Sequence, residues 1–168
     1  VIGYIDNNAP TTIIIGAHFD HLGYGEDHNS LYSGKEKLVH NGADDNASGV
    51  AGILALAHLL KSTNLKYRID LVAYSLEEPP FFGTEQMGSY VHAKSLHDAK
   101  IPVKGMVSLE MIGYFSNEEN SQGYPLGFLK WFYGNKGNYI TIVQKSIQGD
   151  FSKQYKSLAF KNNSLLTK

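Results

Sequence analysis

The segment His40-Asn-Gly-Ala-Asp-Asp-Asn-Ala-Ser-Gly-Val50 is the stretch around which the whole chain is organised. It places two adjacent carboxylates, Asp44 and Asp45, directly before a long apolar helical pattern. Neighbouring aspartates with no basic residue beside them repel each other, and a cation between them and other acids would remove that repulsion. A solvated turn that caps the helix explains the same residues, because Asp, Asn and Ser are good helix caps. Evidence from the rest of the chain is needed to distinguish a cation site from a capping turn.

Strand and helix patterns alternate on both sides of this segment. Strand patterns cover residues 1–5, 11–17, 67–75, 103–109 and 138–143, of which 11–17 and 67–75 are typical of buried strands. Helical patterns cover residues 47–61, 84–99 and 150–161. Such alternation predicts an α/β layer fold with a largely parallel sheet. Sheets of this kind bind their ligands beyond the carboxyl ends of the strands.

Composition excludes several functional classes. The chain has 168 residues, of which 42% are hydrophobic and 18% charged, as expected for one globular domain. Its net charge of −1 gives no electrostatic basis for binding nucleic acid or an anionic membrane. It has no cysteine, which rules out thiolate metal sites and thiol catalysis. We expect no membrane-spanning segment. The compartment stays open, and a secreted, periplasmic or membrane-associated parent is compatible with the sequence.

Polar side chains gather where three of the predicted strands end. His18 and Asp20 follow the strand at 11–17, Glu77 and Glu78 follow the strand at 67–75, and Glu110 follows the strand at 103–109. Each residue alone is better explained as a surface acid at a strand end, or as a hydrogen-bonded core histidine. Their joint placement on one sheet edge, with Asp44 and Asp45 opening the next helix, favours a shared metal site.

Histidine and carboxylates without cysteine suit Zn²⁺ or a similar divalent cation. His18 is the candidate nitrogen ligand, and Asp20, two residues further on, would orient its imidazole. Asp44 would bridge two metals, while Glu78 and Glu110 would each complete the coordination of one.

The adjacent residues Glu77 and Glu78 are expected to have different roles. Consecutive residues in extended chain point in opposite directions, so both should not bind the same ion. One is expected to bind metal and the other to serve as a general base toward the attacking water.

These residues resemble a known family. The motifs are Ala17-His-Phe-Asp-His21, Gly42-Ala-Asp-Asp-Asn-Ala-Ser-Gly49, Glu77-Glu78 and Leu109-Glu-Met-Ile-Gly-Tyr114. In order and spacing they are similar to the co-catalytic zinc exopeptidases of metallopeptidase clan MH, of the aminopeptidase S and aminopeptidase Y type, over roughly residues 1–145. The resemblance implies a three-layer α/β/α sandwich with a mixed, mostly parallel sheet, and a peptide substrate with a free N-terminus.

The resemblance also implies roles for individual residues. His18 and Glu110 would hold one zinc and Glu78 the other, with Asp44 bridging and Glu77 as the general base. Asp20 would support His18. A cis peptide bond between Asp44 and Asp45 is expected as well.

One departure from the family pattern affects the expected chemistry. The family has a further histidine ligand late in the chain, whereas all seven histidines here lie at or before His97. We therefore expect residues 1–168 to be a single catalytic domain that is incomplete at both ends. Such a fragment would hold one zinc or none in place of two, and its peptidase activity would be low or absent. An exposed sheet edge would invite self-association.

Two other functions fit the same residues. A glutaminyl-cyclase-like acyltransferase uses a related fold with one zinc, and a non-catalytic scaffold domain occurs among relatives. The doubled aspartate with His18 favours two metals and hydrolysis. The aromatic run at 128–133 would line a substrate pocket or simply pack.

Overall fold

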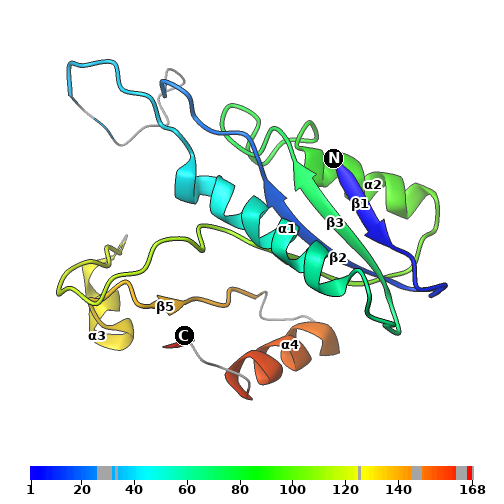
Figure 1. Ribbon diagram of the computed structural model, residues 1–168. Helices are drawn as coiled ribbons and strands as arrows, with labels where there is room; N and C mark the ends of the chain where they lie inside the picture. The colour runs from blue at the N-terminus through cyan, green and yellow to red at the C-terminus, as the bar shows by residue number, and fades with distance from the viewer. Residues whose placement is uncertain (26–31, 33, 125, 145–148, 162–165, 168) are drawn as a thin grey trace. The chain divides into compact units, whose positions relative to one another are not determined.

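The computed structural model describes residues 1–25, 32, 34–124, 126–144, 149–161 and 166–167 (Figure 1). Part of the glycine-rich stretch between Gly23 and Gly42 therefore lies outside the described residues. The chain forms two compact units, Val1–Gly113 and Tyr114–Lys168. All the predicted site residues belong to the first unit. The single domain expected over the whole chain stays a prediction.

The first unit is built on a mixed sheet of four strands. They are β1 (Ile2–Ile5), β2 (Thr12–His18), β3 (Arg68–Tyr74) and β4 (Val103–Ser108). The order is β1-β3-β2-β4, with β2 parallel to β3 and β4 and with β1 antiparallel to β3. The β-branched run at the centre of β2 pairs on both sides, as a buried parallel strand should. The predicted mixed, mostly parallel sheet is confirmed.

One helix covers each face of this sheet, which confirms the three-layer α/β/α arrangement. Helix α1 (Gly49–Leu60) and helix α2 (Gly88–Asp98) lie on opposite sides of the strands (Figure 1). Successive strand side chains point to opposite faces of the sheet and therefore pack into two separate hydrophobic cores. The core that includes α1 contains Ala17, Ile53, Ile69 and Leu71, and the core that includes α2 contains Ile14, Val72, Tyr74 and Leu96.

Both helices begin later than the sequence pattern predicts. The segment 47–61 gives a helix only from Gly49, because Asp45 and Asn46 have non-helical backbone in the preceding turn η1 (Ala43–Ser48). The segment 84–99 gives a helix only from Gly88, after successive turns that follow the two prolines Pro79 and Pro80. Apolar periodicity marks the face of a helix better than its first residue.

The second unit holds short elements. They are the 3-10 helix η2 (Gly127–Leu129), helices α3 (Lys130–Tyr133) and α4 (Asp150–Lys161), and strands β5 (Tyr139–Ile140) and β6 (Leu166–Thr167). The helix predicted at 150–161 is confirmed. The strand predicted at 138–143 is wrong in extent and placement. Only two of its residues pair, with β6 and apart from the main sheet, because strand propensity becomes structure only where a partner strand is available.

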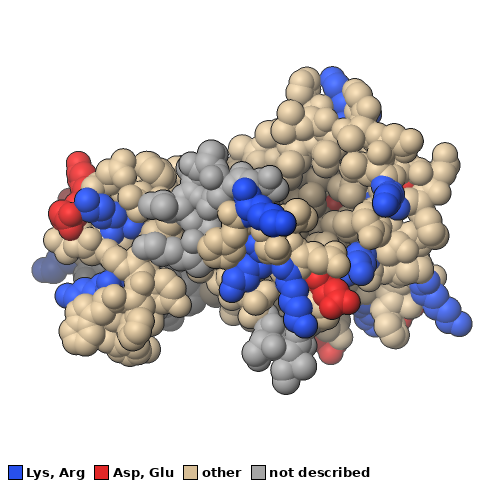
Figure 2. Space-filling view, turned by 90° about the horizontal axis from the view of Figure 1, so that it is seen from below, with Lys and Arg blue, Asp and Glu red and all other residues tan. Residues whose placement is uncertain are grey.

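Charged side chains of both signs are spread over the surface of the protein. On the face drawn in Figure 2, Lys and Arg side chains lie in several separate places, with Asp and Glu side chains near some of them. With a net charge of −1 over the chain, a dense group of acids is a local feature. Across the described residues, every helix is too short or too polar to cross a membrane.

A polar pair is buried under α2. Tyr74 is 7% exposed, and its hydroxyl forms a 2.9 Å hydrogen bond with Nδ1 of His92. Burial, aided by the negative charge of Asp70, raises the pKa of Tyr74 to about 12. Burial lowers the pKa of His92, which favours its neutral form. The pair is therefore uncharged at neutral pH.

This pair predicts a loss of stability at alkaline pH. The pKa of Tyr74 is raised in the folded state, so its contribution is complete below pH 10 and is lost as pH rises through about 12. At pH 11 the loss should be roughly 1 kcal/mol. Urea unfolding at pH 8 and pH 11 should show a smaller pH effect for Tyr74→Phe than for the unchanged chain. The exposed Tyr90 of α2 provides the control, and an equal reduction for Tyr90→Phe would contradict the assignment.

Candidate metal centre

The three parallel strands bring their carboxyl ends to one edge of the sheet. β2 ends at His18, β3 ends three residues before Glu77, and β4 ends two residues before Glu110. Left-handed backbone at Leu76 (φ 59°) and Met111 (φ 45°) turns the chain beside both glutamates. Non-glycine residues seldom adopt this conformation, and where they do it often accompanies a functional site. The predicted gathering of polar residues at one edge is confirmed.

The His18 imidazole is the centre of the group. Its side chain is 2% exposed, and Nε2 lies 3.0 Å from Oδ1 of Asp45. The same nitrogen lies 3.3 Å from Oε1 of Glu110 and 3.7 Å from Oε2 of Glu77. Three carboxylates on three different segments therefore converge on one buried ring nitrogen.

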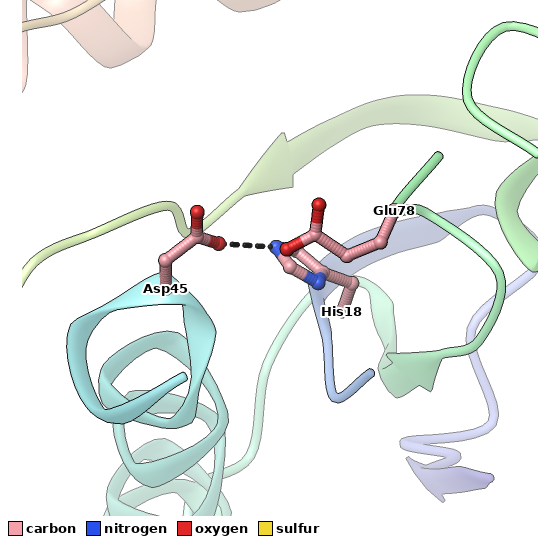
Figure 3. Close-up of side chains that lie close together, drawn as sticks. All are labelled: His18, Asp45 and Glu78. Atoms are coloured by element: carbon pink, nitrogen blue, oxygen red, sulfur yellow. Dashed lines mark ion pairs between the residues drawn. The ribbon is translucent and has the colours of Figure 1, made fainter. Parts of the chain in front are cut away.

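One set of side chains has the spacing of a metal site. His18, Asp45 and Glu78 each offer a ligand atom, and these atoms all lie within 4.8 Å of one another. Figure 3 shows Asp45 from the turn before α1 and Glu78 from the loop after β3, both directed toward His18. One imidazole nitrogen with carboxylate oxygens is a donor set that suits Zn²⁺ and similar divalent ions.

Asp20 supports this group from the second loop position after β2. Its Oδ2 accepts a 3.0 Å hydrogen bond from the backbone N–H of Glu78, which fixes the start of the Glu78 loop. Nδ1 of His18 lies 3.1 Å from the Asp20 backbone carbonyl and 3.6 Å from its carboxylate. The imidazole contact expected of the Asp20 carboxylate is therefore made at hydrogen-bond distance by the backbone of the same residue.

Burial and mutual repulsion shift the ionisation of the group. Burial is the largest cause that raises the pKa of Glu77, Glu78 and Glu110, and the charge of Asp45 raises each further. His18 acts in the opposite direction on all three. For His18 itself, burial lowers the pKa, but the neighbouring carboxylates outweigh burial and leave the pKa raised. The carboxylates are thus only partly neutralised by the histidine.

The structure separates the two adjacent aspartates. Oδ1 of Asp44, the expected bridging ligand, accepts a 2.7 Å hydrogen bond from the backbone N–H of Gly113. Asp45 is instead the residue that reaches His18. The non-proline cis peptide bond lies between Asp45 and Asn46, so its expected position between Asp44 and Asp45 is wrong by one residue. Two acids in a loop carry no periodicity that would tell them apart.

Sequence comparison gives relatives that are longer than this chain. The uncharacterized protein YfbL of Escherichia coli (strain K12) is 48% identical over 131 residues, which are 78% of this chain and 38% of that protein. The alkaline phosphatase isozyme conversion protein of the same organism is 38% identical over 87 residues, or 52% of this chain and 25% of that protein. The chain thus spans well under half the length of these curated relatives.

Two solved structures from Bacteroides thetaiotaomicron share the fold. One is a glutaminyl cyclase bound to N-acetylhistamine and the other a leucine aminopeptidase precursor. Each is 23% identical with a TM-score of 0.54, and each match covers 70% of this chain and 42% of the other.

A family model settles the membership of the chain. Its description is peptidase family M28, and it matches residues 1–165, nearly the whole sequence. The match includes the edge at which His18, Asp45, Glu78 and Glu110 meet. This chain belongs to peptidase family M28.

Proposed function

We propose that this chain forms the metal-binding part of a zinc-dependent exopeptidase that removes residues from the free N-terminus of peptides. The observation that carries the proposal is the convergence of Asp45, Glu110 and Glu77 on Nε2 of the buried His18. Membership of a peptidase family supports hydrolysis of a peptide bond.

The donor set fits a divalent cation. His18, Asp45 and Glu78 would hold it, and Glu110 lies close enough to His18 to contribute. Asp45 is thus proposed as the aspartate ligand in place of its neighbour Asp44, to which the resemblance gives that role. Lewis acidity toward the peptide carbonyl and the attacking water is what a bound zinc ion supplies. The histidine expected late in the chain is absent, so one well-held ion, or weak binding, is proposed for this chain.

Glu77 is proposed as the general base. Its Oε2 faces the same ring nitrogen as the ligands, and the amide of its neighbour Glu78 is fixed by Asp20. Burial raises its pKa above the usual value for a glutamate, which makes it a better proton acceptor from water. Glu77 would take that proton and later return it to the amine of the departing peptide.

The acidic character of the site suits a substrate with a positive end. Asp45 and Glu110 keep 45% and 47% of their side-chain surface exposed beside the buried His18. Carboxylates in this position attract the ammonium group of a peptide N-terminus. This supports aminopeptidase over carboxypeptidase polarity.

A glutaminyl-cyclase-like reaction is the second candidate. It rests on the fold shared with the Bacteroides thetaiotaomicron glutaminyl cyclase, and the aminopeptidase precursor shares that fold equally. Fold alone does not distinguish the two reactions, and the substrate assay below does.

Zinc titration of two neighbouring variants tests the ligand assignment. Asp45→Asn should lower zinc affinity by at least the roughly 10–100-fold that loss of an outer-shell partner costs. Asp44→Asn should leave it within a few-fold, because an amide oxygen can still accept from the Gly113 amide. Competition with a chromophoric chelator measures both. Equal losses, or a larger loss for Asp44→Asn, would contradict the assignment, and absence of binding to the unchanged chain would contradict the zinc proposal.

The same site predicts pH-dependent binding. The raised pKa values of His18, Glu78 and Glu110 mean that protons must leave before the ligands are available. Zinc affinity should therefore fall as pH is lowered from 8 to 6, by up to about tenfold per unit for each proton displaced. Calorimetry in buffers of different ionisation enthalpy should detect proton release. The variant His97→Gln, changed at an exposed position of α2, should show the same pH profile, and a flat profile for the unchanged chain would refute the prediction.

A peptide assay with zinc present tests the reaction. Peptides that begin with leucine or glutamine should lose their N-terminal residue slowly, as shown by mass spectrometry. Glu77→Gln should lower the rate by roughly 10²–10⁴-fold while zinc affinity changes little. The exposed Glu85 supplies the control variant Glu85→Gln, which should keep the rate. Pyroglutamate formation without release of a residue would favour the cyclase, and zinc binding without either product would favour a scaffold domain.

A further inference from the structure

The turn η1 and the loop after β4 are joined by side chains spaced two residues apart. Asp44 binds the amide of Gly113 at 2.7 Å, and the hydroxyl of Ser48 accepts a 3.0 Å hydrogen bond from the amide of Ile112. Asn46 stands between these two residues and is 1% exposed, far more deeply buried than its neighbours in the turn. A fully buried amide side chain must find partners for both of its ends.

Both ends of the Asn46 amide are satisfied. Nδ2 donates to the backbone carbonyl of Leu109 at 2.8 Å and to Oε2 of Glu110 at 3.1 Å. Oδ1 accepts from the amides of Gly49 at 3.1 Å and Met111 at 3.3 Å. Turning the amide over would set nitrogen against two N–H groups and oxygen against two oxygens. The surroundings therefore fix the orientation in which a donor faces Glu110.

The two carboxylate oxygens of Glu110 therefore have different partners. Oε2 receives the Asn46 N–H, while Oε1 lies 3.3 Å from Nε2 of His18. The side chain of Glu110 is 47% exposed, so packing alone holds it loosely. A hydrogen bond from a buried and doubly anchored amide restricts the carboxylate to the orientation that directs Oε1 toward the site.

The backbone around Asn46 is built to bring the two segments close together. A Cβ atom on Gly49 would lie 2.4 Å from Oδ1 of Asn46 and 2.7 Å from the carbonyl oxygen of Leu109. Only glycine permits this approach. The acceptor end of Asn46 also holds the amide of Met111, the left-handed residue that directly follows Glu110.

We propose that Asn46 is a positioning residue that aims the carboxylate of Glu110 at the metal site from the opposite loop. This inference rests on the proposed function, since it assumes that Glu110 helps to hold a metal. Asn46 itself touches neither substrate nor ion. Its effect on metal binding should therefore pass entirely through Glu110.

A double-mutant cycle on zinc affinity tests the proposal. Asn46→Ser keeps a hydroxyl that can accept from the Gly49 amide but is too short to reach Glu110. Alone, it should weaken zinc binding by about 10–100-fold. In a Glu110→Ala background the same change should cost less than about threefold. Ser48→Ala, which removes another bond between the same two segments without touching Glu110, should change zinc affinity less than about threefold.

Readouts other than binding separate a structural effect from positioning. Thermal unfolding of each metal-free variant reports the cost to the fold, and only the Glu110-dependent part of the affinity loss counts as positioning. Equal losses of zinc affinity for Asn46→Ser with and without Glu110 would overturn the proposal, even where Asp45→Asn still shows that the site binds zinc. Failure of the unchanged chain to bind zinc would instead overturn the proposed function.

A measurement on the folded chain covers the case in which Asn46→Ser does not fold. The side-chain amide protons of Asn46 should exchange slowly in NMR spectra, because both ends are buried and bonded. Their resonances should shift in Glu110→Gln and should not shift in Glu85→Gln. Fast exchange, or no response to Glu110→Gln, would overturn the proposal.

Discussion

The parallel pairing of β2 with β3 and β4 is the constraint on which the site depends. In register, His18 lies opposite Tyr74, and Gly16 lies opposite Ser108. The three strands therefore end within a few residues of one another, and whatever follows them has to share one edge. Antiparallel neighbours would have carried the following residues to the opposite edge of the sheet. The shared direction of the three parallel strands, and no single contact, brings the glutamates to His18.

Electrostatic repulsion among the carboxylates at this sheet edge would be reduced by a bound cation. Two like charges about 4 Å apart near a protein surface interact by about 4 kcal/mol, and several carboxylates surround one imidazole here. A protonated His18 offsets one negative charge, yet the pKa values of Glu77, Glu78 and Glu110 all remain raised, chiefly by burial and further by repulsion from neighbouring carboxylates such as Asp45. A divalent ion supplies two positive charges without adding protons. Relief of the remaining repulsion among the carboxylates would contribute to the metal affinity proposed for the site.

The layers, the strands of the first unit and the edge that carries the site follow from the sequence, because long β-branched runs and apolar periodicity are strong signals. The helix starts do not, since Asn46 sits in a non-helical turn that periodicity does not detect. The strand at 138–143 fails because pairing depends on a partner far along the chain. The location of His18, Glu78 and Glu110 at one sheet edge could be predicted because each residue ends or closely follows a strand. The choice between Asp44 and Asp45 depends on which loop each carboxylate meets, and only tertiary structure shows that.

Alternate residues of the turn η1 contact different parts of the site. Asp44, Asn46 and Ser48 bond to the loop after β4, and each accepts at least one of its backbone amides. A carboxylate that already accepts an amide is partly compensated and is held in a structural role. Asp45 falls between two of these anchors, and its side chain reaches His18 instead. The same alternation leaves Asn46 facing inward, where its amide meets Glu110. The two adjacent aspartates thus have different contacts: Asp44 is bonded to the loop after β4, and Asp45 is left facing His18, where the proposed cation would bind.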